Sequence, residues 1–423
     1  MAPLFIPRPK CSRHSLYFLF LFFTSSWTAV AQNVVSGRVI DSLTNEPLPY
    51  VNVFFANTSF GASTDANGEY RFSGFPSGKY DLIFTYVGYV MTQQSVAFTG
   101  DTRVVANQPL VQEAKLLSEV LVKPDTLNWR RNYQSFKHHF LGASKNAAAC
   151  EIKNPKSIFV YFDPRDAVLV AHAREPIIVE NNAMGYRIKY HLHHFEYQGR
   201  PGLFTIFGLP QFEEMEPKNE RERKRWLRER DRAFYGSLNH FMRAWQQQAW
   251  KENDFRVSRL YRIPNKDRPS DAFLDSRIRA LRKKGEMVTI SMGTAGPMEK
   301  PRVVNGDSLS YYLQLRALPK EVDSVVDESL TGKEFAATGD GLMNFRGLLQ
   351  VRYKELEEPG YAAMVGRPDT RIRQRSIVHV FEPIRIYDNG YYEDVRSIFM
   401  ENYWSWSEKI ATLLPLEFQP QPK

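Results

Sequence analysis

Residues 34 to 112 carry short apolar runs with a period of two, which is the pattern of half-buried β-strands. The clearest run is Tyr80–Tyr86, in which Tyr80, Leu82, Phe84 and Tyr86 alternate with Asp81, Ile83 and Thr85. Turn-forming residues separate the runs, as in the segment Asp65-Ala66-Asn67-Gly68. Strands spaced about ten residues apart, with no helical period between them, predict a Greek-key β-sandwich of about seven strands.

The remainder of the chain mixes helical and strand-like patterns. Apolar residues at helical spacing predict helices over Asp125–Leu141, Asn219–Gln247 and Ser270–Lys284. Pro and Gly breakers bound the strand-like runs. These runs are Ser157–Phe162, Ala167–Ala173, Pro176–Glu180, Tyr186–Tyr197, Phe255–Arg262, Glu286–Ser291, Ser308–Leu315, Phe345–Tyr353 and Ser376–Phe381. We therefore expect a mainly β protein, with an N-terminal sandwich at 32–116, a linker at 117–125 and a larger β-rich α+β domain at 126–423. A split of that domain near residue 265 is left open.

Four segments of the N-terminal region resemble a known domain. They are Gly37-x-Val39-x-Asp41, Pro47-Leu48-x-Tyr50-Val51-x-Val53, Thr64-Asp65-x-x-Gly68-x-Tyr70-x-Phe72 and Tyr86-Val87-Gly88-Tyr89. In this order and spacing they are similar to the carboxypeptidase regulatory-like, or transthyretin-like, domain that begins many secreted and outer-membrane proteins of Bacteroidetes. The resemblance implies a binding or spacer module without peptidase chemistry of its own.

Two further resemblances concern the chain beyond this module. Motifs such as Glu175-Pro176-x-Ile178-x-Glu180-Asn181 and Tyr235-Gly236-Ser237-x-x-His240-Phe241 resemble an uncharacterised region that accompanies the module in Bacteroidetes proteins. The segment Leu117-Ser118-Glu119-Val120-Leu121-Val122 is similar to the energy-coupling segment of TonB-dependent transporters. A last strand followed by a Pro-ended linker explains the same residues, because no series of barrel strands follows.

The first 31 residues predict a signal peptide. They comprise the basic residues Arg8, Lys10 and Arg13, the apolar run Leu16–Phe23 and the small-x-small site Ala29-Val30-Ala31. Cys11 precedes the apolar run, so it cannot be the lipid-bearing cysteine of a lipoprotein signal. No later stretch approaches the roughly 20 apolar residues of a transmembrane helix. We expect an exported protein of the periplasm or the outer-membrane periphery that begins near Gln32.

Charge and cysteine content argue against nucleic-acid binding, phosphate binding and thiol chemistry. Cleavage would remove three basic residues and lower the formal net charge from +9 to +6, which gives no argument for nucleic-acid binding. The helical segment near 219–247 mixes acidic with basic residues, which favours a solvated surface with i,i+4 ion pairs over a phosphate site. Cys150 would be the single cysteine of the mature chain, and its apolar neighbours predict a buried thiol rather than a reactive one.

The sequence His172-Ala173-Arg174-Glu175 matches the His-x-x-Glu zinc pair of metallocarboxypeptidases. Such a site needs a third ligand, usually a histidine far downstream, and no histidine lies between His240 and His379. On a continuous strand His172 and Glu175 would also point to opposite faces. These arguments weigh against a zinc peptidase, which stays as an alternative.

Two other sets could bind a ligand. His191 and His193 share one face of a predicted strand with Arg187 and Lys189, so they could hold a metal, although basic neighbours favour a plain polar surface. Tyr403, Trp404 and Trp406, together with Tyr391 and Tyr392, could stack on sugar rings or a partner, or they could be core residues. No nucleophile elbow and no phosphate-binding glycine loop is present.

The sequence thus predicts an exported, non-enzymatic cell-envelope protein whose front module mediates binding or assembly. No cofactor is expected, and the partner is left open between an envelope protein and a glycan. The alternatives are an envelope hydrolase and an accessory of a TonB-dependent outer-membrane system.

Overall fold

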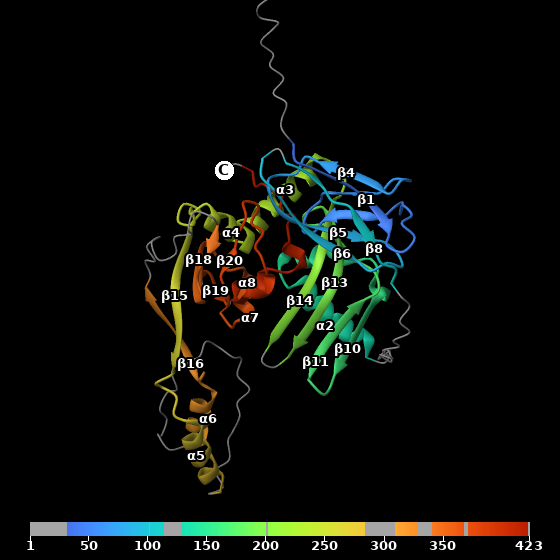
Figure 1. Ribbon diagram of the computed structural model, residues 1–423. Helices are drawn as coiled ribbons and strands as arrows, with labels where there is room; N and C mark the ends of the chain where they lie inside the picture. The colour runs from blue at the N-terminus through green and yellow to red at the C-terminus, as the bar shows by residue number, and fades with distance from the viewer. Residues whose placement is uncertain are drawn as a thin grey trace, which may run out of the picture.

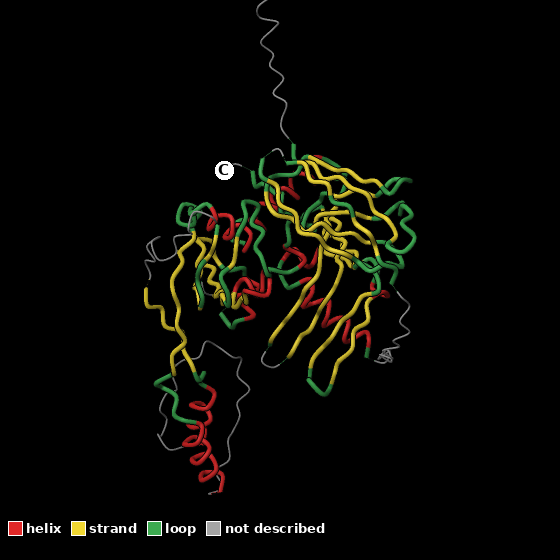
Figure 2. Tube along the Cα trace, viewed as in Figure 1, coloured by secondary structure: helices red, strands yellow, loops and turns green. Residues whose placement is uncertain are grey.

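The protein is presented here as a computed structural model that describes residues 32–100, 102–113, 128–199, 202–283, 309–327, 341–367 and 371–421 (Figures 1 and 2). The predicted signal peptide, the linker at 117–125 with its TonB-like segment, and the predicted strand Glu286–Ser291 lie outside these residues. No helix within the described ranges has the length and apolar composition needed to cross a bilayer.

The N-terminal region is a sandwich of two four-stranded sheets, so it has eight strands rather than seven. One sheet contains β1 (Val34–Asp41), β4 (Glu69–Ser73), β7 (Arg103–Val105) and β8 (Gln108–Leu110). The other contains β2 (Asn52–Phe55), β3 (Gly61–Ser63), β5 (Gly78–Thr85) and β6 (Thr92–Phe98), in the order β3-β2-β5-β6. The chain passes repeatedly between the sheets, and alternate residues such as Val53, Phe55 and Tyr80 fill the core between them.

The sandwich is followed by a six-stranded sheet, and one helix packs on one of its two faces. Its strands are β9 (Cys150–Ile152), β10 (Ile158–Asp163), β11 (Val168–Ala173), β12 (Ile177–Asn181), β13 (Tyr186–Gln198) and β14 (Leu203–Glu214). Helix α2 (Trp129–Leu141) covers that face, because Phe136 packs on Phe195 and Phe140 on Tyr190. The helix and strands predicted for this region are confirmed, with small shifts at their ends.

The predicted helical segment near 219–247 is two helices, α3 (Glu220–Phe234) and α4 (Leu238–Gln246). The break falls at Gly236, whose φ of +88° suits glycine and where a Cβ would lie 2.6 Å from the ring of Tyr353. Three ion pairs on α3 have i,i+3 spacing instead of the predicted i,i+4. They join Glu220 to Arg223, Glu222 to Arg225 and Glu229 to Arg232.

The C-terminal part of the chain contains a five-stranded sheet with the strand order β16-β15-β18-β19-β21. Its strands are β15 (Phe255–Pro264), β16 (Glu321–Asp327), β18 (Gly347–Leu356), β19 (Arg373–Val380) and β21 (Ile398–Asn402). The shorter elements of the chain are α7 (Pro359–Met364), α8 (Tyr403–Ser407), β17 (Leu342–Met343), β20 (Ile384–Arg385), η1 (Lys145–Ala149), η2 (Pro155–Ser157), η3 (Val395–Ser397) and η4 (Ile410–Thr412). The third core lies between this sheet and α4, where Trp245, Phe255 and Trp404 are buried.

Beyond β15 and β16 the chain extends into an arm that ends in the helices α5 (Asp271–Lys283) and α6 (Leu309–Ala317) (Figure 1). Leu274 and Ile278 of α5 pack against Tyr312 and Leu315 of α6. The strand predicted at Ser308–Leu315 is therefore wrong, because Leu309, Tyr312 and Leu315 recur at helical spacing and close a helical pair.

Candidate binding face

The N-terminal sandwich is fixed to the rest of the molecule through the outer face of β2 and β5. Phe54 and Ile83 point away from the core of the sandwich, and both are fully buried in a small cluster with Leu209 of β14. The backbone N–H of Asn57 donates to the carbonyl of Pro210 at 2.7 Å, and the N–H of Phe212 donates back to Thr58 at 2.9 Å. The sandwich thus extends the edge of β14 and is not a separate spacer.

Contacts with the C-terminal part of the chain complete this attachment. The Asn389 side chain donates to the carbonyl of Lys79 at 3.0 Å, and the Tyr391 hydroxyl donates to Asp81 at 2.9 Å. The Lys79 ammonium forms an ion pair with Glu393. The two central strands of this sheet, β2 and β5, are consequently buried on both faces, whereas β3 and β6 keep exposed positions.

His172 lies on β11 with its side chain exposed, stacked at 6.1 Å on Tyr161 of β10. Glu175 lies past the end of the strand, also exposed, and accepts a hydrogen bond from the Asn154 side chain at 3.3 Å. Among the described residues, no group of three His, Cys, Asp or Glu side chains could hold a metal ion. The His-x-x-Glu sequence is therefore not part of an assembled three-ligand site within the described chain.

His191 and His193 lie on either side of Leu192 in β13, but a β-bulge between Leu192 and His194 breaks the simple alternation. The inserted residue leaves His193 and His194 exposed in succession and turns Phe195 into the core. The predicted plain polar face is wrong at His191, because its ring stacks on Phe54 of the sandwich at 5.4 Å.

The strand register brings the predicted histidines to one open surface. Antiparallel partners point to the same side of a sheet, so the row Tyr161, Val170, Glu196 and Thr205 faces outward together. Two positions farther along, Phe159 and His172 continue the row on β10 and β11, and His194 and Phe207 continue it on β13 and β14. We call Phe159, Tyr161, His172, His193, His194 and Phe207 the His/Phe face.

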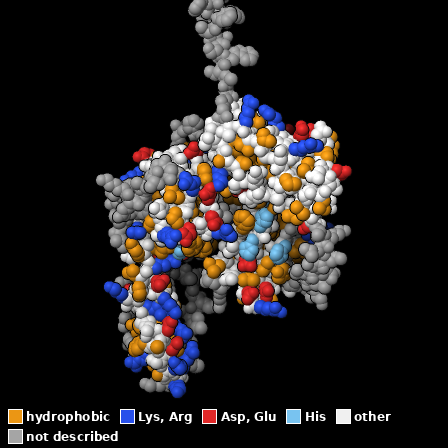
Figure 3. Space-filling view, viewed as in Figure 1, with side chains coloured by type: hydrophobic (Ala, Val, Ile, Leu, Met, Phe, Trp, Pro, Cys, Tyr) orange, Lys and Arg blue, Asp and Glu red, His pale blue; other side chains and the backbone are white. Residues whose placement is uncertain are grey.

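The His/Phe face is apolar, aromatic and accessible. Phe207 is 41% exposed, and His193 lies against its ring at 5.4 Å. The Arg174 guanidinium covers Phe159 at 4.3 Å from the ring centre. Figure 3 shows histidines gathered with hydrophobic side chains over β13 and β14, below the sandwich. Helix α2 occupies the opposite side of the sheet, so this surface has no covering element among the described residues.

The imidazoles of His191 and His193 have lowered pKa values, which favours their neutral forms near pH 7. Burial lowers the pKa of His191 to about 4, with smaller contributions from the charges of His193 and Lys189. Burial also lowers the pKa of His193. A neutral imidazole can both donate and accept hydrogen bonds, so His193 adds a polar group beside the exposed ring of Phe207.

The C-terminal aromatic residues belong to the core. Tyr403, Trp404 and Trp406 are 5%, 2% and 7% exposed, and Tyr403 and Trp406 pack against Tyr361 of α7. The Trp404 indole donates to the carbonyl of Gly236 at 2.8 Å. Their rings are not accessible for stacking on a sugar, which corrects their candidacy as a binding site.

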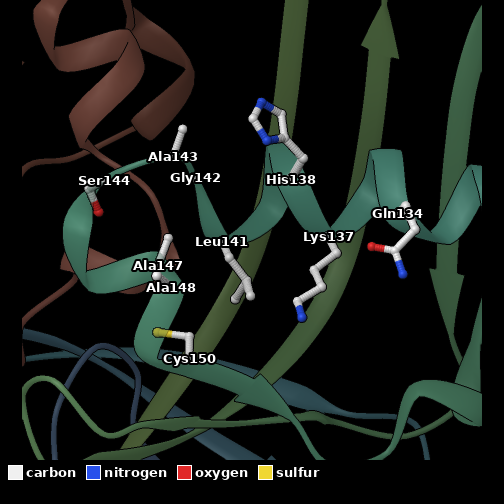
Figure 4. Close-up of a pocket in the computed structure, with 10 residues that line it drawn as sticks. All are labelled: Gln134, Lys137, His138, Leu141, Gly142, Ala143, Ser144, Ala147, Ala148 and Cys150. Atoms are coloured by element: carbon white, nitrogen blue, oxygen red, sulfur yellow. The ribbon is translucent and has the colours of Figure 1, made fainter. Parts of the chain in front are cut away.

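Cys150 is buried as predicted, at the base of a cavity of about 360 Å³ between α2 and η1 (Figure 4). Burial raises the pKa of its thiol to about 12, so the thiolate is scarce at neutral pH. The thiol lies 3.4 Å from the carbonyl oxygen of Asn146. Lys137 and His138 of α2 border the same cavity.

Comparison with known proteins identifies the N-terminal domain. A family model described as the CarboxypepD_reg-like domain matches residues 35–122, which include β2 to β8 and all of β1 except its first residue. The resemblance read from the sequence motifs is therefore confirmed for this domain. A search of curated proteins finds no match.

Three similar solved structures each match about a fifth of the chain. The pilus 2b backbone protein of group B streptococcus is 16% identical, over 20% of this chain and 42% of that chain, with a TM-score of 0.17. BcpA, the major pilin subunit of Bacillus cereus, is 14% identical over 20% and 31%, with a TM-score of 0.17. Wild-type catechol 1,2-dioxygenase of Acinetobacter radioresistens is 14% identical over 21% and 54%, with a TM-score of 0.17. The chain spans less than two thirds of each of these structures.

Proposed function

We propose that the protein is an exported, non-catalytic cell-envelope protein of Bacteroidetes that binds an envelope glycan through the His/Phe face. The observation that carries this proposal is the open sheet surface, with Phe207 41% exposed beside His193 and His194. Aromatic rings offer large apolar area with little loss of conformational freedom, and they pack on the apolar faces of sugar rings. The neighbouring imidazoles and Glu196 supply donors and acceptors for hydroxyl groups.

In this proposal the carboxypeptidase regulatory-like domain supports the sheet that bears the binding surface. It is held against the edge of β14 and against the C-terminal segment, so it keeps the sheet that bears the His/Phe face in a fixed orientation. Rigid presentation lowers the entropy cost of binding. The predicted signal peptide supports placement at the envelope.

Co-sedimentation with insoluble envelope preparations from a Bacteroidetes species tests the proposal. The mature protein should pellet with the envelope, and Phe207→Ser should weaken this binding about tenfold, which corresponds to about 1.4 kcal/mol. Phe381→Ser is the matched control, because Phe381 is 53% exposed and directly follows the end of β19, outside the sheet that bears the His/Phe face.

Enzymatic removal of glycan or protein from the envelope identifies the partner. Release after glycan digestion supports the proposal, whereas release by protease alone would show that the partner is a protein. Equal loss of binding in the Phe207 and Phe381 variants would also contradict a specific role for the His/Phe face.

A further inference from the structure

A separate cavity of about 420 Å³ lies where the α3–α4 junction meets the loop after β18 and the helix α8. Its lining includes Gly236, Ser237, Glu358, Tyr403, Glu408 and Thr412. These residues come from segments that are far apart in the sequence, and α7 and α8 lie next to each other beside the cavity (Figure 1). The volume falls within the range of small-ligand sites, near its lower end.

Carboxylates outnumber cations in the lining of the cavity, which contains Glu355, Glu358 and Glu408 but one arginine, Arg232. Glu408 accepts a hydrogen bond from the backbone N–H of Leu238 at 3.1 Å, at the start of α4. Across the described residues, neither Glu408 nor Glu358 forms an ion pair. Arg232 lines the cavity too, but its guanidinium is paired with Glu229 at 2.8 Å.

Lys409 follows Glu408 in the chain, but its ammonium packs on an aromatic ring and does not form an ion pair with Glu408. Its ammonium lies 3.8 Å from the ring centre of Phe204, on the second sheet. By contrast, the partly buried carboxylate of Glu401 is paired with both Arg262 and His379. The lining of the cavity therefore contains more carboxyl groups than cations, and its arginine, Arg232, is already paired with Glu229.

The protonation behaviour of these groups agrees with this geometry. Burial raises the pKa of Glu408 to about 7, opposed by the Leu238 N–H and by the charge of Lys409. Burial also raises the pKa of Glu358. A hydrogen bond from the backbone of Lys145 and the charges of Arg232 and Lys145 lower this pKa, whereas the charge of Glu229 raises it. A cation placed among these groups would stabilise their ionised forms.

We propose that this cavity binds a cationic group, an ammonium or a guanidinium, on a basic side chain of a partner polypeptide or on a free amine. Glu408 and Glu358 would provide the charge, and the Tyr403 ring would form part of the wall. The site is distinct from the His/Phe face, so the proposal does not depend on envelope binding through that face.

Saturation-transfer NMR with matched probes tests the site directly. Arginine amide and the peptide Gly-Arg-Gly carry the cation, whereas citrulline amide and Gly-citrulline-Gly have nearly the same shape without charge. We expect saturable binding of a cationic probe and none of the neutral ones. Binding of the peptide identifies a polypeptide source, and binding of arginine amide alone identifies a free amine.

Charge-removing variants complete the test. Glu408→Gln keeps an oxygen that can accept from the Leu238 N–H, and it should weaken binding at least tenfold. Glu382→Gln is the control, because Glu382 is an exposed carboxylate paired with Arg346 outside the cavity. Affinity of the unaltered protein should rise from pH 6 to pH 8 as Glu408 ionises. The proposal is overturned if neither cationic probe binds, if the neutral probes bind equally, or if Glu382→Gln weakens binding as much as Glu408→Gln does.

Discussion

Replacing Phe54 with alanine tests whether the N-terminal domain is a fixed part of the molecule. Phe54 is fully buried although it points away from the core of its own sandwich, because His191, Ile83 and Leu209 cover it. Removing a buried Phe ring costs about 3–5 kcal/mol. The cluster around Phe54 is small, so we expect a loss of about 3 kcal/mol in attachment of the domain.

Amide hydrogen exchange and urea unfolding of the full protein measure this loss. The amides of Asn57 and Phe212 bridge the sandwich and β14, and their exchange should accelerate roughly a hundredfold in Phe54→Ala. Phe55→Ala is the control, since Phe55 is equally buried but faces the inner core. Unlike Phe54→Ala, the Phe55→Ala variant should accelerate exchange of the β5 amides, because it removes a ring from the core of the sandwich. A change below about 0.5 kcal/mol in Phe54→Ala would refute the attachment, because exposed positions behave in that way.

Three further predictions concern stability and reactivity. Burial lowers the pKa of both His139 and His191 from 6.5 to about 4. As pH falls, the unfolded chain therefore takes up protons on these histidines before the folded chain does. Their contribution to the free energy of unfolding is fully present above pH 6.5 and is lost as pH decreases towards 4. In urea titrations at pH 7.5 and 5, replacing each histidine by glutamine should reduce this loss by up to about 2 kcal/mol; an unchanged pH dependence would contradict it. Gly37→Ala would place a Cβ 2.0 Å from the carbonyl oxygen after β7 and should cost about 3 kcal/mol, whereas Gly100→Ala has open space and should cost about 1 kcal/mol; equal costs would refute the steric argument. Maleimide should label Cys150 at least about a hundredfold faster in urea than in the native protein, and rapid native labelling would show that the thiol is accessible.

The sandwich was predictable from sequence because strands with one buried face show alternation of apolar and polar residues, as in β4, where Tyr70 and Phe72 face the core and Glu69 and Arg71 are exposed. The continuous run Val53-Phe54-Phe55 also carried a signal of its attachment, since an uninterrupted apolar run is typical of a strand covered on both faces. The element at Ser308–Leu315 was misassigned because short apolar runs fit both a strand and a helix, and only its packing on α5 decides between them.

The candidate sites depend on contacts that local patterns do not encode. The bulge at His193 inserts one residue and shifts the alternation, so the exposed pair His193 and His194 does not follow from periodicity. Phe207 and Tyr161 join the histidines only through strand pairing. Sequence reasoning missed both of these aromatic residues, although the exposed positions of β14 alternate in a way that could have indicated Phe207.

Hydrogen-exchange mapping of the envelope-bound protein tests the central claim most directly. The account predicts slower exchange over β10, β11 and the ends of β13 and β14 that bear the His/Phe face, with the sandwich and the α5–α6 arm unchanged. Protection confined to the arm or to the sandwich, with the His/Phe face exchanging as in the free protein, would contradict the account.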